Sequence, residues 1–386
     1  MENIYKIIPC WVIKNICILW YILRNMIIGV PKEVKNNENR IGLTPQSVEQ
    51  LSKNGHEIFV QKDAGKNIGY FDDQYLNAGA KIINTAEDLY KSSEMVVKVK
   101  EPIPDEYNYL REDLTLFTYL HLAGDPENAK KLIDTGVTGI AYETVTAEDG
   151  SMPLLAPMST IAGQLAVVVG SYHLLKHNKG KGVMIGKLDD IDPRIVSVIG
   201  AGVAGTQSIS KAIDNNAHVK VLDTSQSKLD DLKLKFGSAN IEYILSDKDS
   251  VQDSINESDL VIGSVYVVGK EAPKVIAKEM LASMSPGTVM VDVSIDQGGC
   301  FETSKPTTHD NPTFIENDIV HYCVTNMPGA VPLTATQALN KVTLPYIETL
   351  ANKGISRALE EDNHFMNGLN IKNGLITHPG VKEALG

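Results

Sequence analysis

The chain has 386 residues, with 36 basic and 48 acidic side chains and a formal net charge of −12. This length exceeds one ordinary compact domain and suits two. The acidic balance argues against a protein that binds nucleic acid or an anionic membrane, because both need a basic face. The four cysteines exclude a disulfide scaffold and show no metal-type spacing, which predicts a reducing compartment.

The first 25 residues differ in composition from the rest of the chain, because they hold both tryptophans and two of the four cysteines. Residues 7–23 are almost all apolar, but Lys14 interrupts the run, and a spanning helix needs about 20 apolar residues. No small-residue cleavage site follows the run, as a signal peptide would require. Three interpretations stay open: translation from an upstream start codon, an interfacial or membrane-anchoring helix, and a targeting peptide. We expect residues 1–25 to form an extension outside the fold.

From Met26 onward, predicted strands and helices alternate. A helix is expected over residues 44–54, with Thr44 as its N-cap and Pro45 at its first position, and another over 72–78. Short apolar runs predict strands at residues 27–30, 57–61, 95–100, 115–119 and 139–142. This alternation is typical of an open α/β sheet.

A second α/β run follows a long helix that we expect over residues 160–176, capped by Ser159 and apolar nearly all round. A helix over 334–353, with Pro345 as a predicted kink, closes this run, and the tail after Gly354 should return to the first domain. Strands are predicted at residues 195–199, 219–222, 260–262, 288–293 and 321–324. The chain is therefore expected to be an α/β protein.

A glycine-rich phosphate-binding fingerprint lies between the first two strands of this run. The apolar strand 195–199 leads directly into Gly200, Gly202 and Gly205, spaced as Gly-x-Gly-x-x-Gly. The first glycine permits the tight turn, the second lets backbone approach a pyrophosphate, and the third lets the helix pack on the strand. Asp223 ends the next strand, close to the ~20-residue spacing at which an acidic side chain accepts hydrogen bonds from the ribose hydroxyls of the cofactor. An acid there favours NAD over NADP.

Four ionisable residues follow predicted strands, where an open α/β sheet places its ligands. These are Arg40, Lys100, His121 and Asp296. Each taken alone has a plain structural explanation, such as a surface ion pair or a turn. Together they supply two cations for a carboxylate and a carbonyl, and a histidine and an aspartate that can move protons. This set suits the redox chemistry of an amino or hydroxy acid, in which the cofactor takes the hydride.

From Met26 onward the chain resembles the alanine dehydrogenases of the alanine dehydrogenase/nicotinamide nucleotide transhydrogenase alpha-subunit family. The resemblance runs over nearly all the remaining chain, in order and with few gaps. It rests on the segments 29–33, 36–40, 97–102, 119–123, 141–144, 155–159, 295–299, 326–332 and 344–346.

The resemblance implies two Rossmann-like α/β domains, with a central NAD-binding domain (156–332) inserted in a discontinuous substrate domain (26–155 and 333–386). It implies reversible oxidative deamination of L-alanine to pyruvate and ammonia, with hydride transfer to NAD. It also implies a cytoplasmic homo-oligomer, usually a hexamer, with no metal, nucleic-acid or membrane partner for residues 26–386.

The resemblance also assigns roles to individual positions. Arg40 and Lys100 would bind the substrate carboxylate and carbonyl oxygen, His121 would act as acid/base at the substrate oxygen, and Asp296 would be the second acid/base. NAD contacts are implied at Ser159, Gly200, Gly202, Gly205, Asp223, Lys228, Ser246, Val265, Tyr266, Asn326 and Met327.

Several loops depart from the family pattern and leave other functions open. The departures lie at residues 159–164, 186–190 and 266–271, and Leu333 stands where a basic residue is common. The alternatives are a dehydrogenase of another small amino or keto acid, the NAD-binding part of a transhydrogenase, and an NAD-binding sensor without catalysis. The transhydrogenase family lacks the histidine at position 121 and the stretch 295–299. A sensor needs no proton-transfer pair.

Overall fold

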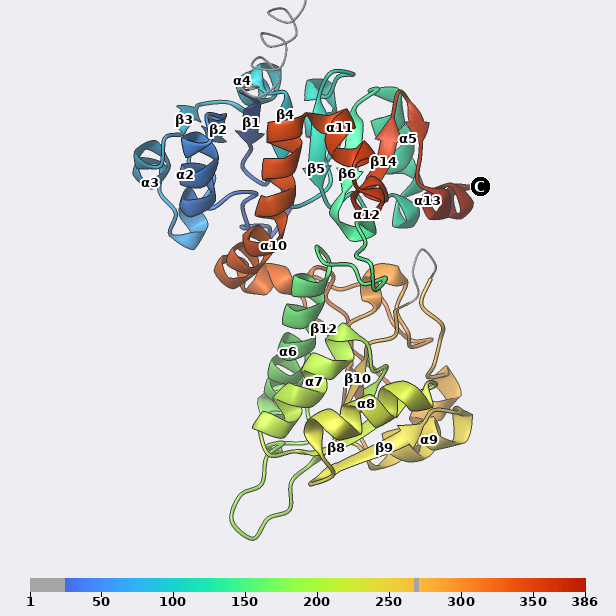
Figure 1. Cartoon of the computed structure of the whole chain (residues 1–386). Coiled ribbons are helices and arrows are strands. Elements are labelled where there is room, and N and C mark those ends of the chain that lie inside the picture. The colour runs from blue at the N-terminus through green and yellow to red at the C-terminus, as the bar shows by residue number, and fades with distance from the viewer. Residues whose placement is uncertain (1–24, 267–270) are drawn as a thin grey trace, which may run out of the picture. The chain divides into compact units, whose positions relative to one another are not determined.

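A computed structural model describes residues 25–266 and 271–386. Residues 1–24 of the predicted N-terminal extension lie outside the described residues. The contacts between described residues divide the chain into two units. The first comprises the described residues up to Leu155 together with Pro332–Gly386, and the second comprises Ala156–Val331. Figure 1 shows the chain coloured along its length.

The first unit is built on an eight-stranded sheet with the order β15-β14-β6-β5-β4-β1-β2-β3. Neighbouring strands from β6 to β3 run parallel, whereas β14 pairs antiparallel with both β6 and β15. The pairing of β14 with β6 confirms that the tail after Gly354 returns to the first domain. The strands are β1 (Ile27–Val30), β2 (Glu57–Gln61), β3 (Lys81–Ile83), β4 (Met95–Val97), β5 (Thr115–Thr118), β6 (Thr138–Ala141), β14 (Leu369–Lys372) and β15 (Leu375–Ile376).

Helices of the first unit come from both ends of the chain. Helix α2 begins as predicted, with the Thr44 side chain accepting a hydrogen bond from the Ser47 N–H and with Pro45 at the first position. The C-terminal helices, red in Figure 1, lie beside blue and cyan elements of the N-terminal half. The helices are α2 (Pro45–Lys53), α3 (Asp72–Asn77), α4 (Ala86–Ser92), α5 (Pro126–Asp134), α10 (Pro332–Lys353), α11 (Ile355–Glu360), α12 (Asn363–Met366) and α13 (Pro379–Leu385).

The second unit is built on a seven-stranded sheet with the order β12-β13-β11-β10-β7-β8-β9. All its pairs are parallel except β12 with β13. Two mainly parallel sheets with their helices confirm the predicted α/β class. The strands are β7 (Ile195–Ile199), β8 (His218–Asp223), β9 (Ile241–Leu245), β10 (Leu260–Gly263), β11 (Val289–Asp292), β12 (Thr313–Glu316) and β13 (Ile319–Tyr322).

The helices of the second unit are α6 (Ala156–His173), α7 (Val203–Asp214), α8 (Gln226–Phe236) and α9 (Lys248–Glu257). The predicted helix 160–176 is shifted: α6 begins at Ala156, so Ser159 lies inside its first turn and is not the N-cap. Pro157 is compatible with the earlier start, because proline is tolerated in the first turn of a helix. The close approach of α6 to α7 requires Gly163, since a Cβ there would lie 2.1 Å from the Ala204 carbonyl oxygen.

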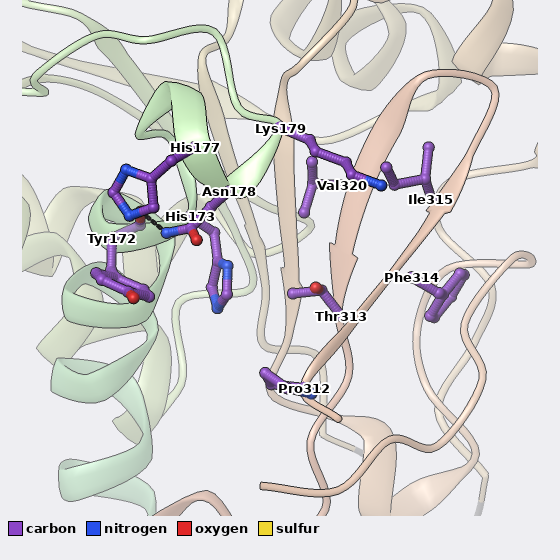
Figure 2. Close-up of a pocket in the computed structure, with 10 residues that line it drawn as sticks. All are labelled: Tyr172, His173, His177, Asn178, Lys179, Pro312, Thr313, Phe314, Ile315 and Val320. Atoms are coloured by element: carbon purple, nitrogen blue, oxygen red, sulfur yellow. Dashed lines mark hydrogen bonds between the residues drawn. The ribbon is translucent and has the colours of Figure 1, made fainter. Parts of the chain in front are cut away.

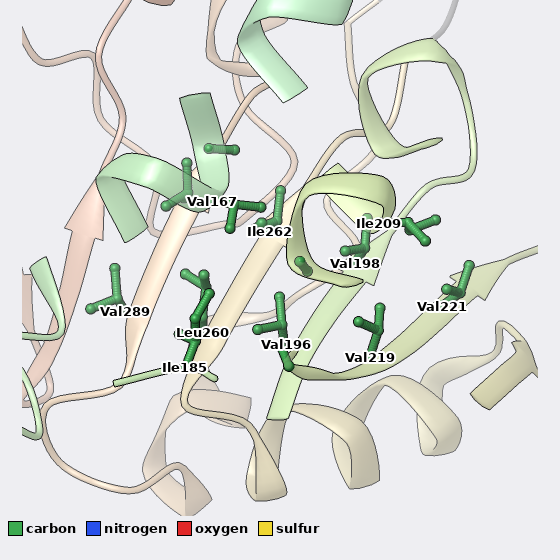
Figure 3. Close-up of a cluster of buried hydrophobic side chains, with 14 of the residues drawn as sticks. Val167, Ile185, Val196, Val198, Ile209, Val219, Val221, Leu260, Ile262 and Val289 are labelled. Atoms are coloured by element: carbon green, nitrogen blue, oxygen red, sulfur yellow. The ribbon is translucent and has the colours of Figure 1, made fainter. Parts of the chain in front are cut away.

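Apolar side chains cover both faces of the second sheet. Alternate residues of β7, β8 and β10 point to one face, where they pack against Val167 of α6 and Ile209 of α7 (Figure 3). The intervening residues, such as Leu222 and Val261, pack on the other face with Val251 and Ile255 of α9. Burial on both faces explains why these strands are apolar nearly throughout, as is usual in parallel sheets.

No helix among the described residues combines the length and hydropathy needed to cross a bilayer. Within residues 25–266 and 271–386, no group of three or more His, Cys, Asp or Glu side chains could hold a metal ion. The two cysteines described, Cys300 and Cys323, are buried thiols.

Candidate active site

The first unit gathers three of the predicted site residues at one edge of its sheet. Arg40, Lys100 and His121 follow β1, β4 and β5, which are neighbouring parallel strands. The carboxyl ends of parallel strands meet at one edge, which is where open α/β sheets bind ligands. The charges of these groups also act on neighbouring side chains: Arg40 affects the ionisation of Tyr119, and Lys100 and His121 both affect that of Glu101.

Arg40 is held by Glu38, two residues earlier. The Glu38 carboxylate accepts hydrogen bonds from the Arg40 backbone N–H at 3.0 Å and Nε at 2.7 Å, and it pairs with Nη2. Burial disfavours the charge of Arg40, but the hydrogen bond and charge of Glu38 outweigh this and raise the arginine pKa. A buried guanidinium that stays charged is suited to binding a carboxylate.

The loop that carries Arg40 is fastened to α10, which comes from the far end of the chain. Thr336 accepts a hydrogen bond from the Ile41 N–H at 3.2 Å, and the Asn340 amide oxygen accepts one from the Thr44 N–H at 2.8 Å. The Asn340 amide nitrogen donates to the Gly42 carbonyl at 3.0 Å. Helix α10 therefore helps to position a residue from the start of the fold.

Lys100 lies just beyond β4, which ends at Val97 and not at Lys100 as the sequence predicted. The Glu33 carboxylate accepts hydrogen bonds from the backbone N–H groups of Val99 at 2.6 Å and Lys100 at 3.3 Å. The strand ends early because these two N–H groups donate to the Glu33 side chain and not to the backbone of a neighbouring strand. The Lys100 Nζ lies 3.8 Å from Oε2 of Glu101.

Beneath this segment lies a buried ion cluster formed by Glu33, Lys98 and Glu106. The Lys98 Nζ donates to the two Glu106 carboxylate oxygens at 2.6 and 2.7 Å and lies 3.8 Å from Glu33 Oε2. Burial raises the pKa of Glu33 to about 7, although Lys98 pulls it down. The two carboxylates together raise the pKa of Lys98 in spite of its burial.

Glu101 adds a negative charge between the cations of this edge. Burial alone would raise its pKa, but Lys100, His121 and Lys35 lower it to about 2. Glu101 also pairs with Lys35 through its other oxygen. The site therefore keeps an ionised carboxylate beside the amine of Lys100 and the imidazole of His121.

His121 occupies an unusual backbone conformation directly after β5. Its φ of 50° and ψ of 31° fall in the left-handed region, which few residues other than glycine adopt. Its imidazole stacks on the Tyr119 ring, with centroids 5.6 Å apart and planes 6° apart. The Tyr119 hydroxyl donates to the Leu154 carbonyl at 2.7 Å, which fixes the stacked ring.

The second unit places most of the remaining predicted residues at the carboxyl ends of its own parallel strands. Such an edge is the usual place of a dinucleotide site, and β7 and β10 form the switch point at which the strand order reverses. Gly200 follows β7, Asp223 ends β8, Ser246 follows β9, Val265 and Tyr266 follow β10, Asp296 follows β11, and Asn326 and Met327 follow β13.

The three fingerprint glycines differ in what prevents a side chain. Gly200 has φ of 98°, which favours glycine. A Cβ on Gly205 would lie 1.8 Å from the Gly200 carbonyl oxygen, whereas a Cβ on Gly202 would meet nothing within 4 Å. Packing therefore accounts for Gly205 but not for Gly202, which stands in open space at the N-terminus of α7. A helix N-terminus with space before it fits a pyrophosphate.

This difference predicts opposite effects for two alanine variants. Gly205→Ala should lower the thermal stability of the protein, because the new methyl group clashes with backbone. Gly202→Ala should leave the melting temperature nearly unchanged and weaken the NAD binding that the sequence predicts. Differential scanning fluorimetry with and without NAD measures both effects. Unaltered NAD binding by Gly202→Ala would mean that this glycine does not approach the cofactor.

Asp223, predicted from the sequence to bind the ribose, also makes two hydrogen bonds within the chain. Its Oδ2 accepts a hydrogen bond from the Ala201 N–H at 2.8 Å, and its Oδ1 accepts one from the Ser225 N–H at 2.9 Å. It therefore ties the glycine turn to the end of β8. Ser246 lies next to it, since its N–H donates to the Asp223 carbonyl at 2.9 Å.

Asp296 is exposed in a short turn after β11, and the buried Asp292 closes that turn. The Asp292 carboxylate accepts hydrogen bonds from the N–H groups of Ser294 at 2.9 Å and Cys300 at 2.8 Å. Asp296 belongs to the second unit, and Arg40, Lys100 and His121 belong to the first.

The other predicted cofactor residues differ in environment. Met327 is buried in the core of the second unit, and Asn326 before it adopts a left-handed conformation with φ of 61°. Lys228 is exposed on α8, Tyr266 is about half exposed, and Ser159 is partly buried on α6.

A cavity of about 530 Å³ lies elsewhere in the second unit, between the end of α6 and strand β12 (Figure 2). On its α6 side, the Asn178 side-chain amide donates to the Tyr172 carbonyl at 2.8 Å. It contains none of the residues predicted from the sequence. Its lining comprises Tyr172, His173, His177, Asn178, Lys179, Pro312, Thr313, Phe314, Ile315 and Val320.

Sequence reasoning did not identify the carboxylates that hold the predicted residues. Glu33, Glu38, Glu101 and Glu143 all lie inside the segments that carry the family resemblance, but no role was assigned to them. The available signal was an acidic residue close to a predicted strand end. A carboxylate that turns inward to accept backbone N–H groups looks the same in sequence as a solvated one.

Comparison with known proteins identifies the family. The alanine dehydrogenase/PNT N-terminal domain model matches residues 29–162, and the corresponding C-terminal domain model matches residues 166–379. The chain is 46% identical to an alanine dehydrogenase of Halomonas elongata over 361 residues, covering 94% of this chain and 97% of that protein. It is 46% identical to an alanine dehydrogenase of Bacillus subtilis over 362 residues, covering 94% and 95%.

Solved structures agree with this result. An L-alanine dehydrogenase structure superposes with a TM-score of 0.89 at 45% identity, covering 93% of this chain and 99% of that chain. A transhydrogenase from Sinorhizobium meliloti superposes with a TM-score of 0.79 at 23% identity, covering 91% and 100%, and this second likeness concerns the fold alone. The protein is therefore a member of the alanine dehydrogenase/PNT family.

Proposed function

We propose that the protein is an NAD-dependent alanine dehydrogenase, which deaminates L-alanine to pyruvate and ammonia reversibly. The observation that carries the proposal is the edge of the first sheet, where Arg40, Lys100 and His121 meet with their supporting carboxylates. The whole-length similarity to curated alanine dehydrogenases supports the substrate. We further propose a cytoplasmic homohexamer, as the family resemblance implies.

Each residue of the first sheet's edge has a role that follows from its chemistry. The Arg40 guanidinium, buried and charged, binds the substrate carboxylate, and the Lys100 ammonium polarises the carbonyl oxygen of pyruvate. The His121 imidazole passes a proton to or from that oxygen. Asp296 is the second acid/base and handles the protons of water and ammonia.

NAD, when bound, accepts the hydride from the substrate carbon. The residues of this chain that would hold it lie at the carboxyl edge of the second sheet. The α7 N-terminus with Gly200, Gly202 and Gly205 would face the pyrophosphate, and Asp223 would accept hydrogen bonds from the ribose hydroxyls. The open space at Gly202 supports this assignment. Ser159, Lys228, Ser246, Val265, Tyr266, Asn326 and Met327 are proposed as further contacts.

The reductive direction tests the reaction class. Purified protein with NADH should consume NADH when pyruvate and ammonium are supplied together, and should not when either is omitted. Consumption with pyruvate alone would indicate a hydroxy-acid dehydrogenase and overturn the amino-acid assignment.

A second candidate is a dehydrogenase of another small amino or keto acid. The observation that favours it is the departure of segments 159–164, 186–190 and 266–271 from the family pattern. Under this alternative the hydride and proton transfers stay the same, and the substrate pocket differs. A panel of amino acids separates the two candidates.

Cofactor choice is predicted to depend on the charge of Asp223. Asp223→Arg should raise kcat/KM with NADP relative to NAD, because the carboxylate that repels a 2′-phosphate becomes a cation that attracts it. Absolute activity should fall as well, since the variant loses the hydrogen bonds to Ala201 and Ser225.

The matched control for this prediction is Asp231→Arg, which makes the same charge change at an exposed position of α8. Its NADP/NAD ratio should equal that of the parent protein. An unchanged ratio in Asp223→Arg would count against Asp223 as the ribose-binding acid.

A further inference from the structure

Glu143 lies at the carboxyl end of β6 and holds the backbone on which His121 is mounted. Its Oε1 accepts hydrogen bonds from the N–H groups of His121 at 2.6 Å and Leu120 at 3.1 Å, and its Oε2 lies 3.3 Å from the Leu120 nitrogen. Within residues 25–266 and 271–386, the Glu143 carboxylate makes no hydrogen bond to another side chain. Its contacts therefore serve this turn.

The turn needs such support because His121 is in the left-handed region, with φ of 50°. A residue with a Cβ persists there only where its surroundings determine the conformation, and such strain gathers at functional sites. The same conformation directs two successive N–H groups to one side, where they form a small anion-binding concavity. Glu143 supplies the anion.

The position of the carboxylate also defines the direction of the imidazole. Glu143 fixes the backbone of residue 121, and the stack on Tyr119 fixes its ring. Hydrogen bonds to an ionised acceptor are stronger than those between neutral groups. The charge of Glu143 also reaches Tyr119 and His378, so the group lies among the side chains around this turn.

We propose that Glu143 is a positioning residue for His121: its carboxylate locks the left-handed turn so that the imidazole faces the substrate oxygen. This inference rests on the proposed role of His121 as the acid/base. Glu143 does not exchange protons with the substrate. It acts through the backbone N–H groups of Leu120 and His121.

Two substitutions separate the hydrogen bonds from mere space filling. Glu143→Ala removes the acceptor and should lower kcat roughly 10- to 100-fold, because a displacement of about 1 Å at a reacting group can cost that much. KM for L-alanine and for NAD should change little, since Arg40 and the NAD-binding residues are untouched. Glu143→Gln keeps one oxygen at the position that receives both N–H groups and should restore most of kcat.

The decisive measurement is a double-variant cycle with His121→Ala. If Glu143 acts through His121, the double variant should be no slower than His121→Ala alone, because the imidazole that Glu143 positions is gone. Glu148→Gln is the matched control, since Glu148 is an exposed glutamate of the following loop. It should leave kcat and thermal stability unchanged.

The outcomes distinguish failure of this inference from failure of the proposed function. Normal kcat in Glu143→Ala with a large loss in His121→Ala overturns the inference and leaves the proposed function standing. Additive losses in the double variant, or a melting temperature that falls with kcat and is not restored in Glu143→Gln, would make Glu143 a purely structural residue. Normal turnover in His121→Ala would remove the acid/base role itself, on which the inference rests.

Discussion

His121→Ala is expected to lower turnover at least ~100-fold, the usual scale of general acid–base catalysis. The imidazole follows β5 at the edge where Arg40 and Lys100 lie. Substrate binding should be largely kept, because Arg40 and Lys100 remain. Steady-state kinetics of L-alanine oxidation, with kcat and KM determined separately, measure the effect.

A second variant tests whether the loss in His121→Ala comes from the missing imidazole or from a change in the left-handed backbone. His121→Asn removes the imidazole but suits the left-handed backbone, which asparagine tolerates better than alanine. It should lose as much turnover as His121→Ala. His177→Ala, at an exposed histidine of the second unit, should behave like the parent protein. A near-normal rate in either His121 variant would remove this residue from the mechanism.

Lys98→Met is expected to destabilise the fold by about 3–5 kcal/mol, because breaking a buried ion pair leaves an uncompensated buried charge. Lys98 is fully buried, and its ammonium pairs with Glu106 and lies 3.8 Å from Glu33. Methionine keeps the length and apolar stem of the side chain, so the change removes mainly the charge. Urea unfolding followed by circular dichroism gives the difference.

The same variant should respond to pH in a defined direction. Burial already raises the pKa of Glu33 to about 7, and loss of the Lys98 charge raises it further. A carboxyl group whose pKa is higher in the folded than in the unfolded protein loses stability as pH rises. The loss of stability relative to the parent should therefore be larger at pH 8 than at pH 5.5.

Lys53→Met provides the control, because Lys53 forms an exposed ion pair with Glu49. Such pairs contribute about 0–1 kcal/mol, so this variant should unfold close to the parent. A loss of stability in Lys98→Met no larger than in Lys53→Met would contradict the account of the buried cluster.

Much of the fold could be predicted from the sequence because its signals are local. The strand before Gly200 and the turn after it are specified by adjacent residues, and the structure has β7 at Ile195–Ile199 as predicted. Thr44 and Pro45 likewise begin α2 in the predicted way. The alternation of strands and helices then implied parallel sheets, whose carboxyl ends hold the candidate residues.

The features that were missed depend on residues far apart in the chain. Glu33 ends β4 early by accepting hydrogen bonds from the N–H groups of Val99 and Lys100, more than sixty residues later in the chain. Asn340 of α10 fixes the Arg40 loop. Short edge strands such as β3, β12 and β15 carry too few residues for a pattern. The left-handed turn at His121 depends on Glu143, which lies 22 residues later in the chain. The residues of the turn include no glycine at position 121 that would have predicted this conformation.

The measurement that tests the central claim most directly is NADH formation at alkaline pH with L-alanine, beside glycine, L-serine and L-valine. We predict a rate with L-alanine well above the other three. A clear rate with another amino acid and none with L-alanine would contradict the proposed substrate and keep the chemistry. No rate with any of them, while NAD still binds, would contradict the catalytic assignment itself.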